Sequence, residues 1–345
     1  MCRPLRCFRI SNVNLRTDFL ECPGKIGELK VAKKETSGTV KRSWFTVVAN
    51  DFKRNKWMYL LAVPAIIWYI VFCYKPMYGL IIAFKDYKGI WGIAGSPWVG
   101  LKHFENFFGS IYFWRLLKNT ILLNVYGLIF GFPIPIILAL MMNELRSQKY
   151  KKIIQTTSYL PHFISLVVVC GMVIDFTSGR GFITYYVNQL TGKDYKNLLE
   201  QKEFYKTIYV VSDIWQTAGW GSIIYLAALA GVDMSLYEAA KIDGAGKWKQ
   251  LWHVTIPSIM PTIVIMFILR VGSIMSIGAD KTILLYKEIT YETADIISSY
   301  VFRQGIGGGN YSFSTAVGLF NSVINCILVV SANALSKKFT DSGLF

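Results

Sequence analysis

Residues 233–257 read DMSLYEAAKIDGAGKWKQLWHVTIP and form a polar segment between two long apolar stretches. At its start, Ser235 and Glu238 have the spacing of a capping box, in which the hydroxyl and the carboxylate satisfy free backbone amides at the beginning of a helix. Ala239 and Ala240 then continue the helix, because alanine loses no side-chain entropy there. The first half of the segment therefore predicts a short helix with a smooth alanine face.

The second half of the segment contains residues that interrupt a helix. Gly244 and Gly246 are expected to break the first helix, since glycine costs a helix about 1 kcal/mol relative to alanine. A second short helix is expected over residues 247–253, and Pro257, which has no backbone N–H, is expected to end it. The pattern predicts a helix-turn-helix at a membrane surface that is suited to docking in a partner's groove. An ordinary amphipathic connector is an equally good interpretation of the residues alone.

On both sides of this segment the sequence is strongly apolar. Of the 345 residues, 53% are apolar and only 17% are charged, below the roughly 25% that is usual in soluble domains. A membrane-spanning helix needs about 20 mostly apolar residues. Six stretches meet this requirement: residues 57–74, 120–142, 157–174, 208–230, 257–277 and 313–335. We therefore expect an all-α, polytopic membrane protein with six transmembrane helices.

The positive charge of the chain indicates its orientation. The net charge of +16 would by itself also suit a protein that binds nucleic acid. Basic residues that precede a first span hold that side in the cytoplasm, and here they are Lys41, Arg42, Lys53, Arg54 and Lys56. The first span lacks a cleavage site and is expected to stay as an anchor. With six spans, both termini are then cytoplasmic.

The polar segment also resembles the EAA loop of the membrane subunits of ABC importers. That loop has Glu-Ala-Ala, three residues, Gly, nine residues, an aliphatic or β-branched residue, one residue, an aliphatic residue and Pro. The matching residues are Glu238, Ala239, Ala240, Gly244, Val254, Ile256 and Pro257. The family keeps this loop in the cytoplasm, which agrees with the orientation indicated by charge.

The resemblance extends over residues 57–345 and is to the LplB-type branch of carbohydrate permeases, which Gram-positive bacteria use for complex oligosaccharides. The stretches that carry it begin at Lys75, Ser158, Ser212, Leu226 and Ala316 and read KPMYG, SYLPHFIS, SDIW, LAALAG and AVGLFNSVIN. It implies a type I ABC importer permease fold for residues 46–345, with the coupling loop at 233–257, and oligosaccharide import across the cell membrane. Residues 1–45 are expected to form a cytoplasmic arm that is poorly ordered, because they contain few apolar runs.

The resemblance also implies partners. In such importers the short helix near Glu238 sits in a cleft of a separate ATPase, whose closure switches the membrane bundle between inward-open and outward-open. The coupling residues would be Glu238, Ala239, Ala240, Asp243, Gly244 and Pro257. This chain has no Gly-x-x-x-x-Gly-Lys-Ser/Thr sequence, so a partner ATPase dimer would use the ATP and Mg, and this chain would bind no cofactor. A second permease of similar fold and an extracellular solute-binding lipoprotein would complete the importer.

Polar residues within the apolar stretches indicate where substrate passes. Asp213, Gln216, Thr217 and Trp220 are spaced i, i+3, i+4 and i+7, which is one face of a helix. Polar groups at membrane depth face the bundle interior or an aqueous cavity, so Trp220 is suited to stacking on a sugar ring. Arg270, about halfway along the fifth stretch, is the other candidate. An Arg270 ion pair with Asp213 or Asp175 that only holds helices together is an equally good interpretation.

Alternative functions remain open at this point. A permease for a non-sugar solute would share the same loop. A membrane enzyme, such as a glycosyl or lipid transferase, would need clustered acids or a metal set. The histidines His103, His162 and His253 are dispersed, and the six cysteines contain no Cys-x-x-Cys pair, so no metal site is predicted. A channel subunit would have no use for the Glu-Ala-Ala segment.

Overall fold

The computed structural model describes residues 51–52, 54–275 and 278–340, and its chain divides into two units, Met1–Ile66 and Ile67–Phe345. The predicted arm, residues 1–45, lies outside the described residues. In the first unit, the Asp51 carboxylate accepts hydrogen bonds from Asn55 Nδ2 and Tyr59 Oη, both at 2.7 Å. Helix α2 (Lys56–Trp68) begins beside this group.

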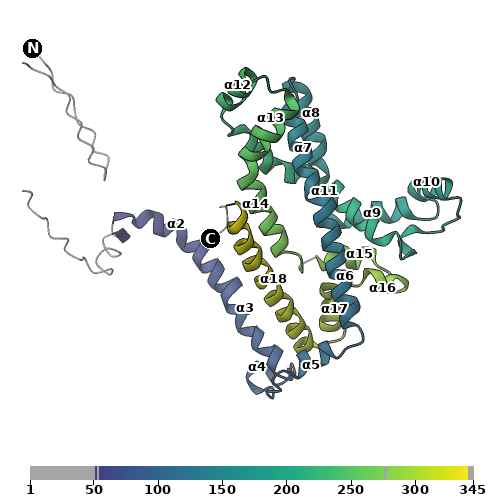
Figure 1. The fold of residues 1–345 in the computed structure, drawn as a ribbon. Helices are drawn as coiled ribbons and strands as arrows, with labels where there is room; N and C mark the ends of the chain where they lie inside the picture. The colour runs from purple at the N-terminus through teal and green to yellow at the C-terminus, as the bar shows by residue number, and fades with distance from the viewer. Residues whose placement is uncertain (1–50, 53, 276–277, 341–345) are drawn as a thin grey trace, which may run out of the picture. The chain divides into compact units, whose positions relative to one another are not determined.

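The described residues of the second unit are helical and contain no sheet, although Lys85 and Trp98 form an isolated β-bridge (Figure 1). Its first helices are η1 (Tyr69–Tyr74), α3 (Lys75–Met77), η2 (Tyr78–Phe84), α4 (Gly92–Gly95), α5 (Lys102–Phe108), α6 (Phe113–Tyr126), η3 (Gly127–Gly131), α7 (Pro133–Glu144), α8 (Gln148–Tyr159) and η4 (Leu160–Phe163). Then follow α9 (Leu166–Thr177), α10 (Phe182–Thr191), η5 (Leu198–Glu200), α11 (Tyr205–Ala230), α12 (Met234–Ile242), α13 (Lys247–Gln250), η6 (Leu251–Thr255) and α14 (Ile256–Gly272). The last are α15 (Ala279–Leu285), η7 (Glu288–Thr290), α16 (Tyr291–Ala294), α17 (Ile297–Phe302), η8 (Arg303–Gly307) and α18 (Tyr311–Thr340).

Five helical segments are long and apolar enough to cross a membrane. They are Lys56–Phe84, Phe113–Glu144, Leu166–Thr191, Lys247–Gly272 and Tyr311–Lys338. The sixth is α11, which meets the criterion together with α12, from which it is bent by 69°. Counting this bent pair as one span, the predicted all-α membrane protein with six transmembrane helices is confirmed.

The third span does not lie where the sequence predicts it, at residues 157–174. Helix α8 ends at Tyr159, and the 3-10 turn that contains Pro161 follows it. The next helix begins only at Leu166, where the Ser165 hydroxyl accepts a hydrogen bond from the backbone N–H of Val168. Ile164 is extended, with φ −75° and ψ 132°, so the apolar run is divided between two helices.

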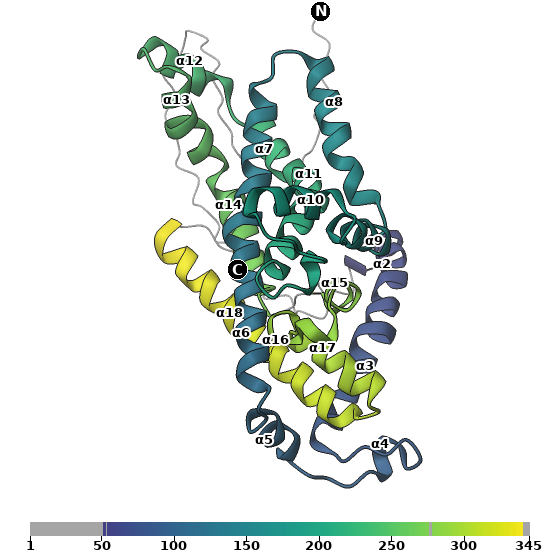
Figure 2. The same cartoon turned by 90° about the vertical axis from the view of Figure 1, so that its right-hand side faces the viewer.

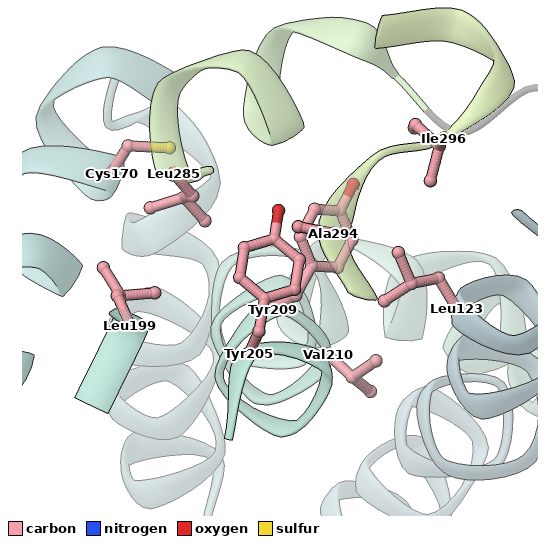
Figure 3. Packing of buried hydrophobic residues seen from close by; sticks show 9 residues of the cluster. All are labelled: Leu123, Cys170, Leu199, Tyr205, Tyr209, Val210, Leu285, Ala294 and Ile296. Carbon is pink, nitrogen blue, oxygen red and sulfur yellow. The ribbon is translucent and has the colours of Figure 1, made fainter. Parts of the chain in front are cut away.

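Helix α11 lies at the centre of the bundle and packs along α7, while α18 packs against α14 and η2. Figures 1 and 2 both show α12 and α13 at one end of the bundle and α4 and α5 at the other. One buried cluster joins Tyr205 and Tyr209 of α11 to Leu123, Cys170 and Leu285 from three other helices (Figure 3). These contacts fix the first turns of α11 against α6, α9 and α15.

A glycine permits the close approach of α11 to α8. A Cβ atom at Gly219 would overlap the backbone carbonyl of Ser158. The apolar lipid offers no hydrophobic force to bring membrane helices together, so their association depends on close packing. Small residues permit this packing by letting the two backbones come into contact. The position of α11 beside α8 therefore depends on this glycine.

Two asparagines of α18 hold the chain where α14 ends. Asn321 Nδ2 donates to the carbonyl of Met275 at 2.8 Å, and Asn325 Oδ1 accepts from the N–H of Met275 at 3.0 Å. Met275 lies in the turn that follows α14, so both asparagines bind its backbone and join α18 to this turn. They satisfy backbone groups that the end of a helix leaves free.

Candidate functional site

The predicted coupling loop begins with the short helix α12, but this helix is capped differently from the prediction. The carboxylate of Asp233 accepts the N–H of Ser235 at 2.9 Å, and α12 begins at Met234. The predicted capping box of Ser235 and Glu238 was therefore wrong. Asp233 caps the helix because it precedes the first helical residue and its side chain reaches the N–H two residues later. This hydrogen bond holds the pKa of the Asp233 carboxyl below its ordinary value.

The end of α12 explains the glycine of the motif. Gly244 has φ +75°, in the left-handed region that favours glycine. Its N–H donates to the carbonyl of Lys241 at 3.0 Å, and the N–H of Ala245 donates to the carbonyl of Ala240 at 2.8 Å. This is the Schellman arrangement, which satisfies the last carbonyls of a helix. The prediction that the glycines break the helix is confirmed.

The surface of α12 carries the predicted coupling residues. Glu238, Ala239, Asp243 and Gly244 are exposed, and Ala240 is half-buried. The apolar side chain of Ile242 is 86% exposed. The loop is thus well defined along its backbone and open on its outer surface.

Two side-chain contacts hold the loop, one within it and one to the bundle. Tyr237 Oη and Thr255 Oγ1 lie 3.0 Å apart, and Lys247 Nζ donates to Glu144 Oε2 at 2.8 Å. The first contact joins α12 to η6, and the second joins α13 to the end of α7. The contact between Tyr237 and Thr255 therefore links α12 to the segment that continues into α14.

Pro257 does not end the second helix, so this prediction was wrong. The helix runs without a break from Lys247 to Gly272. A π-helical turn, Leu251–Thr255, lies directly before Pro257, which occupies the first turn of α14. Proline is tolerated in a first turn, and the local change of helix type accommodates its missing N–H. The coupling loop is consequently continuous with a transmembrane helix.

A cavity of 200 Å³ lies within the bundle, between α6, α11 and α14. Its lining includes Asn124, Tyr209, Asp213, Arg270 and Ser273. Gly127, near the middle of the Phe113–Glu144 span, also lines it. The cavity therefore lies inside the bundle, beside the middle of one span and the last turn of another. Polar side chains within membrane spans are expensive unless they serve a function.

Asp213 is paired with a residue that the sequence analysis missed. Lys281 Nζ lies 3.3 Å from Asp213 Oδ1 and donates to the carbonyl of Tyr209 at 3.1 Å. It also lies 4.7 Å from the centre of the Tyr209 ring. The Lys281 side chain is only 6% exposed, whereas that of Asp213 is 38% exposed. One oxygen of Asp213 is thus held by a buried cation while the carboxylate still reaches the cavity.

Arg270 lies in the last turn of α14 rather than halfway along its span, because the helix ends at Gly272. Its guanidinium lines the cavity, with Nη2 3.2 Å from where a Cβ at Gly127 would stand. Among the described residues it forms no ion pair. The interpretation in which Arg270 pairs with Asp213 or Asp175 was therefore wrong.

The rest of the predicted helix face points elsewhere. Gln216 Nε2 donates to the carbonyl of Ile164 at 3.3 Å, and Trp220 stacks on His162 with ring centres 4.6 Å apart and planes at 5°. Thr217 Oγ1 donates back to the carbonyl of Asp213 at 2.8 Å. Of the four residues on this face, only Asp213 lines the cavity with Arg270. Gln216 and Trp220 instead contact the segment between α8 and α9.

The sequence analysis also missed Asn124, Tyr209 and Ser273 as lining residues. Asn124 lies inside an apolar stretch, and a search for every polar side chain within the spans would have found it. Lys281 follows the fifth span and carried no such signal. Its burial depends on α15 folding back against α9.

Comparisons with known proteins agree with this architecture. Residues 131–341 match the family model described as binding-protein-dependent transport system inner membrane component. Protein LplB of Bacillus subtilis is 43% identical over 88% of this chain and 94% of its own length. The polygalacturonan/rhamnogalacturonan transport system permease protein YteP of the same species is 42% identical over 85% of this chain and 91% of its own.

A solved structure is similar in both sequence and fold. It is described as a bacterial ABC transporter involved in the import of the acidic polysaccharide alginate. It has 42% identity and a TM-score of 0.78, and the match covers 85% of this chain and 99% of that one. The resemblance read from the sequence is confirmed, and the enzyme and channel alternatives are set aside for a non-catalytic, multi-pass transport subunit. With a family model that covers more than half of its length and two relatives above 40% identity, the chain belongs to the inner membrane components of binding-protein-dependent transport systems.

Proposed function

We propose that this chain is a membrane subunit through which an ABC importer carries oligosaccharides into the cell. Support for the substrate class comes from relatives at 42% identity whose names refer to polygalacturonan, rhamnogalacturonan and alginate. The basic residues before the first span support a cytoplasmic N-terminus. With six spans, the C-terminus lies on the same side, and the loop that contains α12 faces the cytoplasm.

Helix α12 is the coupling helix, and a cleft of a separate ATPase receives it. The exposed surface of Glu238, Ala239 and Asp243 between two capped ends supports this role. The loop connects α11 to α14, and these two helices carry Asp213 and Arg270 of the cavity. Movement of α12 therefore changes the distance between the two sides of the cavity. This connection is the observation that carries the proposal.

In this proposal the substrate path includes the cavity lined by Asp213 and Arg270 and continues, outside that cavity, along α11 to Gln216, Thr217 and Trp220. The cavity of 200 Å³ is smaller than the roughly 300–1,000 Å³ pockets that enclose a small ligand. An oligosaccharide therefore needs a wider path, which a second permease of similar fold completes. Trp220 offers a ring face for a sugar once its stack with His162 opens.

The proposed importer contains three further kinds of subunit or partner. They are the second permease, an ATPase dimer that uses ATP and Mg, and an extracellular solute-binding lipoprotein. The chain itself binds no nucleotide in this scheme, since its sequence contains no phosphate-binding Gly-x-x-x-x-Gly-Lys-Ser/Thr motif.

Glu238→Lys and Gly244→Asp test the coupling role. Both changes should leave the chain in the membrane but release the ATPase or uncouple its hydrolysis, with oligosaccharide uptake falling at least about tenfold, the loss that one charge-assisted contact represents. Glu203→Lys is the matched control, because Glu203 is also an exposed glutamate and precedes α11 at its other end. Co-purification of the ATPase and uptake of labelled oligosaccharides are the measurements.

The outcomes separate the parts of the proposal. If Glu238→Lys and Gly244→Asp each keep the ATPase in the complex and transport normally, α12 is not the coupling helix. Uptake of a non-sugar solute and of no oligosaccharide by the unchanged importer would instead overturn the substrate class.

A further inference from the structure

The charged side chains at and beside the cavity carry more positive than negative charge. Arg270 and Asp213 line the cavity, and Lys281, which does not line it, pairs with Asp213. Lys281 is satisfied by Asp213, by the carbonyl of Tyr209 and by the face of the Tyr209 ring. Arg270 has no carboxylate partner among the described residues. The positive charge of Arg270 therefore has no carboxylate partner among the described residues, at a cavity inside the bundle.

This position is an expensive one for a cation without a partner. Charged side chains within membrane spans normally pair with one another or line an aqueous path. The carbonyl end of α14 favours a nearby cation, but by only about 0.3–1 kcal/mol. The helix end therefore does not replace a full negative charge.

Three side-chain oxygens at the cavity accept no hydrogen bond from the part of the chain that the structure describes. Asn124 donates through Nδ2 to the carbonyl of Thr120, which leaves its Oδ1 as an acceptor. Ser273 donates its hydroxyl hydrogen to the carbonyl of Arg270, which leaves its oxygen as an acceptor. Lys281 takes one oxygen of the Asp213 carboxylate and leaves the second. A matching ligand needs several O–H donors and one anionic group.

A sugar that bears a carboxylate has this combination of groups. Its hydroxyls donate to Asn124, Ser273 and Asp213, and its carboxylate receives the two parallel N–H bonds of a guanidinium fork. We infer that Arg270 binds a carboxylate of the transported sugar and that the substrate is an acidic, uronate-type oligosaccharide. This inference rests on the proposed function in oligosaccharide import.

Uptake by cells that carry the whole importer tests the assignment. The probes are oligosaccharides prepared from polygalacturonate and from alginate, their carboxyl-reduced counterparts, and neutral gluco- and arabino-oligosaccharides. The variants are Arg270→Gln, which removes the charge, and Arg270→Lys, which keeps it without the fork. Arg180→Gln is the control, because Arg180 is an exposed arginine on the turn between α9 and α10. Membrane levels of each variant are matched by immunoblot.

We expect the unchanged importer to take up at least one acidic probe. Arg270→Gln should lower that uptake at least about tenfold, the loss of one charge-assisted interaction. Arg270→Lys should retain an intermediate uptake, and Arg180→Gln should not differ from the unchanged protein.

Three results would overturn the inference. The first is uptake of neutral probes alone, which leaves oligosaccharide import standing without the carboxylate. The second is undiminished acidic uptake by Arg270→Gln. The third is equal loss in the Gln and Lys variants, which would indicate a packing role. If no carbohydrate probe is taken up by the unchanged importer, the proposed function fails first.

Discussion

The coupling loop and the central cavity are built in opposite ways. In the loop, Asp233, Ala240 and Gly244 form their hydrogen bonds with residues at most five positions away, and the result is exposed to solvent. In the cavity, Asn124 and Arg270 come from helices far apart in the sequence. A loop of this kind depends on local backbone chemistry, whereas the cavity depends on every helix contact that surrounds it. Changes to helix packing should therefore strongly disturb the cavity. Changes to the loop surface should have little effect on the fold.

Gly219→Ala is expected to give the largest effect on stability. Its Cβ would meet the carbonyl of Ser158 and force α11 away from α8, at a cost of about 3 kcal/mol of unfolding free energy. Unfolding by SDS in mixed micelles measures this difference. Gly171→Ala is the matched control, since Gly171 also lies in an apolar helix and a Cβ there would have no atom within 4 Å. Equal stability of the two variants would contradict the close approach of α8 and α11.

Asp213→Asn is expected to cost less, about 2 kcal/mol. Breaking a buried ion pair leaves an uncompensated charge, here the 6% exposed Lys281, while the half-exposed carboxylate limits the loss. The double variant Asp213→Asn with Lys281→Met should recover most of this stability, because it removes the stranded charge. The same SDS titration on the two single variants and the double variant completes a double-mutant cycle, which measures the interaction energy of the two side chains. Additive costs would show that the two side chains do not interact.

Lys247→Met is expected to give the smallest effect, below about 0.5 kcal/mol of unfolding free energy. The pair of Lys247 and Glu144 is exposed, with 70% and 55% of the side chains accessible, and exposed pairs contribute little. Its removal tests whether the loop is held mainly by its own backbone. A loss as large as that of Asp213→Asn would mean that the loop and the bundle depend on each other more than the local bonds indicate.

The sequence predicted the coupling loop better than it predicted the cavity. The Glu-Ala-Ala segment and its glycine break were predicted because helix capping and glycine conformation are local properties. The cap itself was assigned to Ser235 instead of Asp233, since both spacings are allowed and only the first helical residue decides between them. The prediction that a helix ends at Pro257 was wrong because a π-helical turn accommodates the proline.

The sequence by itself determined the helical membrane class, the existence of the coupling loop and the residues of its turn. Apolar length and backbone preference act over a few residues, so they are visible in the chain. Only the tertiary structure decided that Asp213 pairs with Lys281, that Trp220 stacks on His162, and that Arg270 lines a cavity without a carboxylate partner among the described residues. These relations join segments that are distant in sequence, and side-chain packing and charge burial select them from many pairings that the sequence would allow.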